Sequence, residues 1–309
     1  MSARNSRSLD AISTGAPLRG LADLFQEPDL SFLMEAHDAL SAVIAERSGF
    51  QGLWASGLSI SASLGFRDAN EASWTQVVEV VERMADTTTI PILVDGDTGF
   101  GNFNNARIAA LKLFQRGAAG ICLEDKAFPK MNSFVGARHP LADVDEFCGR
   151  LRAVKDTVPS GTFALVARIE ALIAGHGQAE ALMRAHAYTE AGADAILIHS
   201  RKSTADEIFT FAREWSNRLP LVIVPTKYFN TPVAAYREAR ISTVIWANHA
   251  MRASVSAMNQ VCRRIMAEQS IAGIESEVAT LEEVFGLMNY DELALAEARY
   301  LPHQSNGGA

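Results

Sequence analysis

Residues 90–125 read IPILVDGDTGFGNFNNARIAALKLFQRGAAGICLED and contain one complete unit of the predicted fold. An apolar run at 90–97 and another at 120–125 flank a stretch at 103–118 whose apolar residues recur at helical spacing. The run at 90–97 is apolar almost without alternation, which is typical of a parallel strand buried on both faces. The segment therefore predicts a strand, a helix and a second strand parallel to the first.

The same alternation recurs along the chain. The other apolar runs are FLMEAH (32–37), GLWAS (52–56), FALVARIE (163–170), DAILIHS (194–200), LVIVPT (221–226) and TVIWAN (243–248). Amphipathic stretches between them lie at 72–86, 180–193, 204–217 and 231–240. Eight strand–helix units in one chain predict an α/β fold of the (β/α)8 TIM-barrel type. A doubly wound open sheet is the competing architecture.

Two further helical stretches, at 251–269 and 280–301, follow the eighth unit. The second exceeds what barrel closure requires, and its surplus apolar face predicts docking on another subunit in a homo-oligomer. The ends of the chain lack periodicity. We therefore expect a flexible arm at 1–20, a single barrel domain with its C-terminal helices at 21–302, and a flexible tail at 303–309.

Composition narrows the function. The 309 residues include 28 Lys and Arg against 36 Asp and Glu, a net charge of −8. That balance argues against a nucleic-acid partner but permits a small anionic substrate. No apolar run reaches the roughly 18 residues of a membrane span. Cys122, Cys148 and Cys262 form no metal or redox motif, and with no secretory signal they predict a cytoplasmic protein.

Charged residues follow successive strands at the end where such barrels carry their active sites. They include Asp95, Asp97, Glu124, Arg168 and His199. Strand ends leave the core and are often polar, so any single member also fits a solvated loop. Charges of both signs on several successive strands favour a site for chemistry.

The three carboxylates suggest a metal. Asp95 and Asp97 are two residues apart on one strand, so both side chains point to the same side, and Glu124 ends the next strand. Three neighbouring carboxylates repel one another unless a cation lies among them. Oxygen ligands without a Cys or His cluster favour Mg²⁺, with Mn²⁺ as a substitute, over zinc. The alternative for Asp97 is that it caps the following helix.

Arg168 and His199 suggest an anion. Arg168 would anchor a carboxylate or phosphate, or would instead form a structural salt bridge with Glu170 or Glu124. His199 would position an anionic group, or be a core histidine with its hydrogen bonds satisfied. The residues alone therefore predict a Mg²⁺-dependent barrel enzyme acting on a small acid that bears carboxylate or phosphate.

Two loops at the predicted mouth are unusually long. The first of these loops spans residues 57–74. At its start, Ser56, Gly57 and Leu58 offer a hydroxyl and backbone N–H groups to an anion. The loop at 125–143 is polar, and such a loop over a barrel mouth is a candidate lid. An ordinary surface loop is the alternative for both.

Seven segments carry a resemblance to a known family: GLWASGLSISASLGFRDANEASWTQVVEV, DGDTGFGNFNNAR, CLEDKAFPKMNSF, VARIEALIAGHG, ADAILIHS, VIVPTKYFNTP and VIWANHAMRASVSA. They resemble the phosphoenolpyruvate mutases of the isocitrate lyase superfamily from about residue 30 to 302. The EDK-x-FPK-x-NS loop is specific, whereas DTG-x-GN marks the superfamily more broadly.

The resemblance implies an isomerase that interconverts phosphoenolpyruvate and phosphonopyruvate, and so makes the carbon–phosphorus bond in the first step of phosphonate biosynthesis. It implies that Mg²⁺ is required. It also implies a barrel whose eighth helix swaps between the subunits of a homodimer, with dimers pairing into a homotetramer.

The resemblance also assigns roles to individual residues. Asp68 matches the essential aspartate that acts toward the phosphoryl group, with a covalent phospho-aspartate and a metaphosphate-like species both open. Arg168 and His199 match the groups that grip that phosphoryl. Lys130 and Asn132 lie on the gating loop that closes over the substrate.

The remaining matches concern the metal and the pyruvyl group. Asp95 matches the principal metal ligand, and Asp97 and Glu124 match residues that support the metal largely through water. The segment that holds the pyruvyl carboxylate and carbonyl side is Ser56, Gly57 and Leu58. Departures from the family pattern, which bear on substrate preference and lid closure, are Gly96, Ala127, Met131 and Phe134.

Three rival functions remain. Phosphonopyruvate hydrolases, which release pyruvate and phosphate, resemble the chain over the same span, but their lid typically lacks the asparagine found here as Asn132. Carbon–carbon lyases of the superfamily carry a catalytic Cys in a K-[KR]-C-G-H lid that this chain lacks. A catalytically dead barrel used as a scaffold conflicts with the intact set of site residues.

Overall fold

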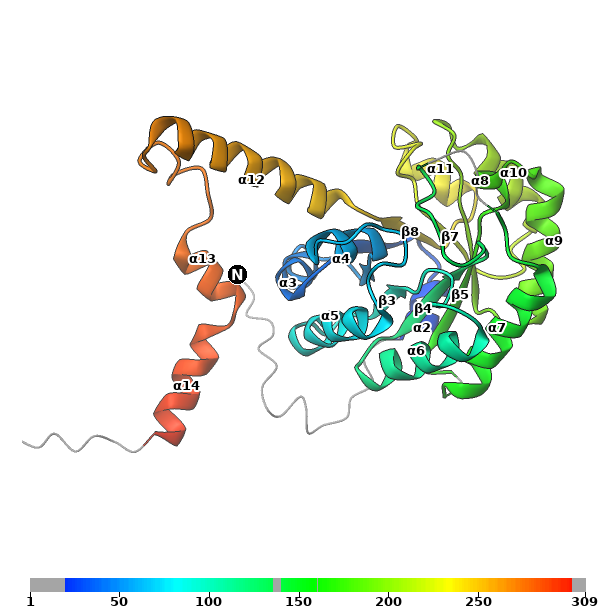
Figure 1. Ribbon diagram of the computed structural model, residues 1–309, viewed down its shortest axis with the longest axis horizontal. Helices are drawn as coiled ribbons and strands as arrows, with labels where there is room; N and C mark the ends of the chain where they lie inside the picture. The colour runs from blue at the N-terminus through cyan, green and yellow to red at the C-terminus, as the bar shows by residue number, and fades with distance from the viewer. Residues whose placement is uncertain (1–19, 136–139, 160, 302–309) are drawn as a thin grey trace, which may run out of the picture. The chain divides into compact units, whose positions relative to one another are not determined.

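The structure, a computed structural model, describes residues 20–135, 140–159 and 161–301 (Figure 1). Its strands are β1 (Ser31–Ala36), β2 (Gly52–Ala55), β3 (Ile92–Asp95), β4 (Gly120–Glu124), β5 (Ala164–Ile169), β6 (Ala195–Ile198), β7 (Leu221–Ile223) and β8 (Thr243–Trp246). Each pairs in parallel with the next, and β8 pairs with β1, which closes the barrel. The predicted TIM-type barrel is therefore confirmed, and the open doubly wound sheet is excluded.

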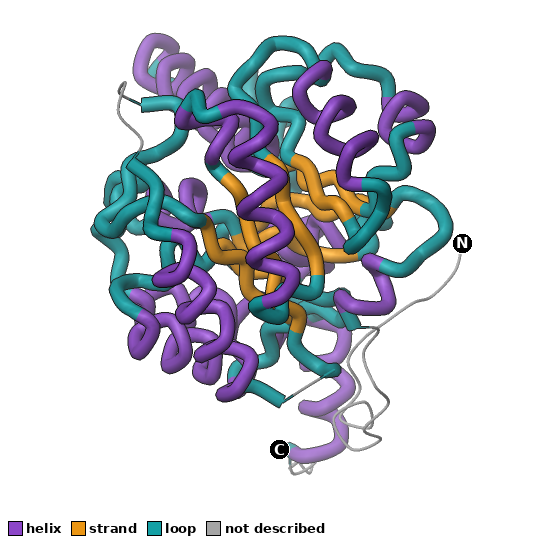
Figure 2. The backbone as a smooth tube through the Cα atoms, turned by 90° about the vertical axis from the view of Figure 1, so that its right-hand side faces the viewer, coloured by secondary structure: helices purple, strands orange, loops and turns teal. Residues whose placement is uncertain are grey.

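Helices surround the strands, as Figure 2 shows. The longer ones are α3 (Ala39–Arg47), α5 (Trp74–Thr87), α6 (Phe103–Gln115), α7 (Val144–Thr157), α9 (Gly177–Glu190) and α10 (Asp206–Trp215). Shorter ones are α2 (Leu21–Phe25), α4 (Gly57–Ser63), α8 (Ala171–Ala174) and α11 (Val233–Glu238). The apolar stripe of α5, which includes Val77, Val81 and Met84, is buried against the outer face of the barrel.

Over two residues, the interior of the barrel changes from apolar to polar along β2 to β6, whereas β7 and β8 lead to the apolar Val224 and Ala247. The lower layer is a buried cluster of Leu33, Trp54, Leu93, Cys122, Val166, Leu197, Val222 and Ile245. Side chains two positions further along a strand point the same way. Those residues, which line one pocket, are Ser56, Asp95, Glu124, Arg168, His199, Val224 and Ala247. The polar side chains of the upper layer therefore lie directly above the buried apolar layer, which we call the apolar floor.

The short helix α2 seals the opposite end of the barrel. Leu21, Leu24 and Phe25 belong to the same buried cluster as the lower layer. Ser31, the first residue of β1, and Ser242, the residue before β8, donate side-chain hydrogen bonds to the carbonyls of Leu24 and Phe25 at 3.2 and 2.7 Å. The apolar floor is therefore closed from below.

The chain falls into two compact units, the barrel unit ending at Ala253 and a second beginning at Ser254. The helices past the barrel are α12 (His249–Glu268), α13 (Leu281–Leu287) and α14 (Tyr290–Tyr300). The single domain over 21–302 stays a prediction. Apart from Gly20, the arm and tail lie outside the described residues. Within the described ranges, no helix has the length and apolar character needed to cross a membrane.

Candidate active site

A pocket of about 60 Å³ lies at the C-terminal ends of the strands. Its walls come from Trp54, Ser56, Leu58, Asp68, Asp95, Glu124, Lys130, Asn132, Ser133, Phe134, Arg168, His199, Val224, Thr226, Ala247 and Asn248. All the predicted site residues line it except Gly57 and Asp97. A volume that holds roughly four to six water molecules suits a small metabolite.

Gly57 and Asp97 lie directly behind the wall, in contact with Asp95. The backbone N–H groups of Gly57 and Asp97 each donate to a different oxygen of the Asp95 carboxylate at 3.3 Å. A Cβ at Gly57 would lie 3.1 Å from both Asp95 Oδ2 and Asp97 Oδ1. A larger residue would therefore require both carboxylates to shift by a few tenths of an ångström. Ser56 is the N-cap of α4 and accepts a hydrogen bond from Ser59 N.

The capping alternative for Asp97 is wrong, because Asn102 is the N-cap of α6. Gly96, one of the departures from the family pattern, is packed closely against the side chains of Ile121 and Leu123. A Cβ there would lie 2.6 Å from Ile121 Cδ1 and 2.9 Å from Leu123 Cδ2, so an alanine needs these side chains to move.

The carboxylates fit a divalent cation. Burial raises the pKa of Asp95 and raises that of Asp97 to about 7, although Lys130 acts in the opposite direction. Glu124 Oε1 is buried and accepts no hydrogen bond from the described residues. No three His, Cys, Asp or Glu side chains of the described ranges converge closely enough to hold a metal alone. Mg²⁺ suits such a site, because it commonly takes one or two carboxylates plus waters and substrate oxygens.

The lid residues Lys130 and Asn132 reach across the pocket to Asp68. Lys130 Nζ lies 2.7 Å from Asp68 Oδ1, and Asn132 Nδ2 donates to Asp68 Oδ2 at 2.5 Å. Lys130 Nζ also lies 2.5 Å from Asp97 Oδ1. Burial opposes the charge of Asp68, but Lys130, Asn132 and Arg168 outweigh it and lower the pKa of this carboxyl. Asp68 is therefore ionised at neutral pH.

Arg168 and His199 are fixed by a buried carboxylate, Glu170. Arg168 Nε donates to Glu170 Oε1 at 2.6 Å, and His199 Nδ1 lies 2.8 Å from the same oxygen. Arg168 Nη2, which can only donate, lies 2.9 Å from the same Nδ1, so Nδ1 stands between a donor and an acceptor. Burial lowers the pKa of His199 against the pull of Glu170, so the ring is neutral at pH 7.

Glu170 also ties this pair to the lid, which the sequence analysis did not foresee. Ser133 Oγ donates to Glu170 Oε2 at 2.8 Å and lies 3.1 Å from Arg168 Nη2. Lys126 Nζ lies 2.5 Å from Ser133 Oγ and 3.4 Å from Glu170 Oε2. Lys126 and Ser133 both belong to the EDK-x-FPK-x-NS segment, so this motif could have indicated that they take part in the site.

The base of the lid is a buried clamp. Lys126 and Leu141 form an antiparallel bridge, and Asp125 begins the segment that they close. Arg184 on α9 donates to Asp125 Oδ2 and to the carbonyl of Ala142, each at 3.1 Å. No local pattern predicts Arg184, because it lies 59 residues from Asp125 along the chain. Residues 136–139 of the predicted lid lie outside the described residues.

Another missed residue is Asn70, which joins the two long loops. Its side-chain oxygen accepts from Lys130 N at 2.7 Å, and its Nδ2 donates to Asp97 Oδ2 at 2.8 Å. Asn70 lies two residues after Asp68 in the segment GFRDAN. Its position beside a predicted catalytic residue is the feature of the sequence that could have identified it.

The atypical lid residues have different surroundings. Phe134 packs edge-on against His199 with ring centroids 5.6 Å apart, and Lys227 Nζ lies 4.8 Å from the Phe134 ring centre. Met131 has a side chain that is 47% exposed. Ala127 contributes its backbone to the lid base, where its N–H donates to Pro140 O. Phe134 is thus the departure that touches the pocket.

Together these features define a barrel enzyme with a small pocket at the C-terminal ends of its strands, lined by carboxylates and by the cations Lys130 and Arg168, and bounded by residues of the loop after β4. Comparisons place it more narrowly. The family profile described as phosphoenolpyruvate phosphomutase matches residues 21–266. The chain belongs to the phosphoenolpyruvate phosphomutase family.

Individual relatives are similar over most of the chain. The phosphoenolpyruvate phosphomutase of Tetrahymena pyriformis is 54% identical, over 91% of this chain and 94% of its own. The crystal structure of the phosphoenolpyruvate phosphomutase from Streptomyces platensis subsp. rosaceus is 41% identical, with a TM-score of 0.89 over 91% of this chain and 98% of that one. A phosphonopyruvate hydrolase in complex with oxalate and Mg²⁺ is 39% identical, with a TM-score of 0.86 over 91% and 98%.

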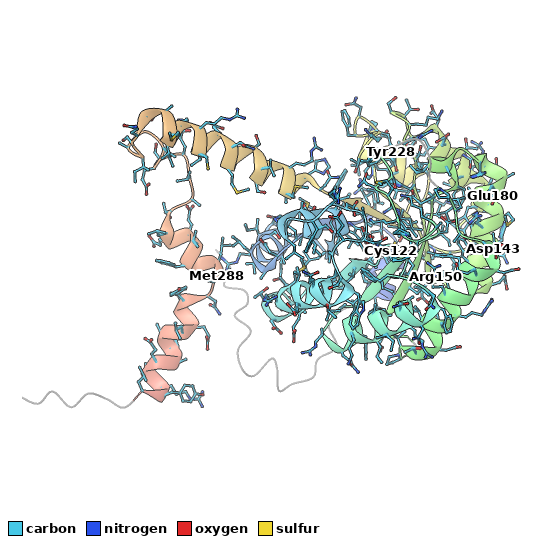
Figure 3. All side chains as sticks on the ribbon, in the orientation of Figure 1. Cys122, Asp143, Arg150, Glu180, Tyr228 and Met288 are labelled. Carbon is cyan, nitrogen blue, oxygen red and sulfur yellow. The ribbon has the colours of Figure 1, made fainter. Side chains whose placement is uncertain are left out.

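We predict that Glu170→Gln lowers kcat/KM roughly 10- to 100-fold, because the neutral amide removes the charge that pairs with Arg168 and leaves a single acceptor oxygen where Arg168, His199 and Ser133 now share two. Circular dichroism checks that the fold is retained. A matched control is Glu190→Gln, which removes an exposed carboxylate paired with Arg218 at the end of α9, the outer helix on which Figure 3 labels Glu180, and it should leave kcat/KM unchanged.

The conservative Ser133→Ala variant separates alignment from folding. It removes one hydrogen bond to Glu170 without changing charge, so a milder loss of the same parameter is expected. Wild-type kinetics in both the Glu170 and Ser133 variants would contradict the alignment role.

Proposed function

We propose that this protein interconverts phosphoenolpyruvate and phosphonopyruvate, and so forms and breaks a carbon–phosphorus bond. The observation that carries the proposal is Asp68, an ionised carboxylate held by two lid residues in a pocket that also presents Arg168 and His199. A small pocket with an anion clamp on one side and an acceptor carboxylate on the other suits movement of a phosphoryl group within one small molecule.

The bonds balance without any co-reactant. In the direction from phosphonopyruvate, the bond between phosphorus and C3 breaks, and its electron pair remains with the pyruvate portion as an enolate. The phosphoryl group then bonds to the enolate oxygen, which gives phosphoenolpyruvate. A loose phosphoryl transition state needs mainly positioning and charge stabilisation. Arg168 supplies permanent positive charge, since Glu170 and Glu124 raise its pKa further against burial.

Asp68 is placed to receive or steady the phosphoryl group between the two bonding steps. Its ionisation is secured by Lys130 and Asn132, which belong to the lid, so the carboxylate is fully organised only when the lid is closed. A covalent phospho-aspartate and a metaphosphate-like species are both compatible with this arrangement.

Asp95, with Asp97 and Glu124 acting through water, would hold Mg²⁺. When bound, this ion stabilises the negative charge of the enolate oxygen. Gly57 keeps the space beside Asp95 and Asp97 clear, and Ser56 and Leu58 line the neighbouring wall where we place the pyruvyl group.

The lid decides between rearrangement and hydrolysis. Lys130, Asn132, Ser133 and Phe134 cover the pocket, and the exclusion of water keeps the phosphoryl group from a competing acceptor. Phosphonopyruvate hydrolysis is the second candidate, since a hydrolase is also similar to this chain. The 54% identity to the Tetrahymena phosphomutase, against 41% to a phosphonopyruvate hydrolase of Variovorax in the same comparison, favours the mutase.

The first experiment is incubation with phosphonopyruvate and Mg²⁺, followed by phosphorus NMR. We expect a phosphoenolpyruvate signal that Asp68→Ala abolishes with the fold intact. Glu71→Gln, on the same loop but exposed and paired with Arg67, is the matched control and should keep wild-type activity. Early inorganic phosphate and pyruvate without phosphoenolpyruvate would instead identify a hydrolase.

We predict that Asn132→Ala slows rearrangement about 10- to 100-fold and diverts part of the turnover to inorganic phosphate, because Asp68 loses its amide partner. The ratio of phosphate to phosphoenolpyruvate measures the diversion. An unchanged rate and ratio would mean that Asn132 does not guard the phosphoryl group.

We predict that Mg²⁺ with oxalate, an analogue of the pyruvate enolate, raises the melting temperature, because ligands that bind only the folded state stabilise it. Oxalate with a chelator should give no shift, and Asp95→Asn should lose most of it. Mn²⁺ should substitute for Mg²⁺. An identical melting temperature under all conditions would contradict the assigned metal and enolate sites.

The oligomer and the cytoplasmic location remain proposals. The second unit, from Ser254 onward, exposes large apolar side chains, with Met266 at 77%, Leu281 at 71% and Leu295 at 74%. We propose that a second copy of the chain covers them, in a homodimer or homotetramer; mass in solution distinguishes these states. The absence of disulfides among the three cysteines is compatible with a reducing compartment.

A further inference from the structure

A second pocket adjoins the reaction pocket and belongs wholly to the barrel unit. Its volume is about 780 Å³, against about 60 Å³ for the reaction pocket. We call it the outer pocket, and its lining consists of Phe134, Thr226, Lys227, Phe229, Asn248, His249, Arg252 and Ala253. Phe134, Thr226 and Asn248 line both pockets, so the two are neighbours with the lid phenylalanine as a shared wall.

The charge of the outer pocket is positive. Lys227, Arg252 and the titratable His249 line it, and no acidic residue does. Among the described residues, Lys227 contacts the Phe134 ring and Arg252 contacts only Asn248, so neither has a carboxylate partner. His249 begins the 20-residue helix α12, whose N-terminal end also favours an anion.

The reaction pocket has the opposite balance. Three carboxylates, Asp68, Asp95 and Glu124, line it against two cations, Lys130 and Arg168. The whole chain carries a net charge of −8. A divalent cation would offset the excess of carboxylates in the pocket, but the net charge of the chain still repels a small acid with two or three negative charges, and a local basic surface counters that repulsion.

We infer that the outer pocket is an anion-docking site that collects small polyanionic carboxylates before they pass Phe134 into the reaction pocket. The inference rests on the proposed function for the identity of the ligand, which is the phosphorylated or phosphonylated three-carbon acid. Lys227 stacks on the Phe134 ring when the lid is closed, so movement of that ring both joins the pockets and frees the lysine for the anion.

The test compares two double variants with equal net charge. Lys227→Gln with Arg252→Gln removes the two cations of the outer pocket. Arg107→Gln with Lys112→Gln removes two exposed cations of α6 instead, as the control. Turnover of phosphonopyruvate is measured between about 10 mM and about 150 mM ionic strength, over which the screening length falls from about 30 Å to about 8 Å.

We expect the outer-pocket variant to lower kcat/KM about tenfold at low ionic strength, with a gap that narrows as salt rises and with kcat unchanged. The α6 variant should follow the wild type. Equal salt dependence in both double variants would overturn the inference. So would a fall in kcat at every salt concentration, because that places the two cations in the chemical step.

A binding measurement keeps this test independent of the proposed reaction. Absence of wild-type turnover would refute the proposed function but not the docking site. Calorimetric titration with phosphoenolpyruvate at low ionic strength should then show weaker binding, by several-fold, in the outer-pocket variant alone. Equal affinity in all three proteins, or no binding to the wild type, would overturn the docking site.

Discussion

The buried carboxylate of Glu170 connects the barrel to its lid. A fully buried charge is tolerated only when paired and hydrogen-bonded, and here Arg168, His199, Ser133 and Lys126 surround it. Two of these partners rise from barrel strands and two come from the lid. The position of the loop after β4 and the alignment of Arg168 and His199 therefore depend on the same carboxylate.

The balance between carboxylates and cations accounts for the arrangement of the other charged residues in the pocket. The barrel rim gathers more carboxylates than cations, and burial raises the pKa of Asp95 and Asp97. Lys130 on the lid offsets part of this charge, and a divalent cation would offset more. Two further cations, Lys227 and Arg252, lie one wall away, beyond Phe134.

Individual residues show how far sequence reasoning reaches. The strand runs predicted the barrel, and the end of each strand marked Asp95, Glu124, Arg168 and His199, because a parallel barrel brings strand ends together. Resemblance added Asp68 and the lid pair Lys130 and Asn132. Arg184 escaped prediction, because a helix residue that meets Asp125 59 positions away leaves no local periodicity or motif.

The sequence by itself determined the closed barrel, since eight apolar runs separated by amphipathic helices have few other ways to bury both faces. It also determined the chemical types at the rim. Only the tertiary structure decided which of them touch. Lys130 and Asp68 lie on separate loops, and the choice of Asp68, Asp97 and Asn70 as its partners depends on how the lid folds over the barrel. Contacts between distant loops follow from packing, which no local spacing encodes.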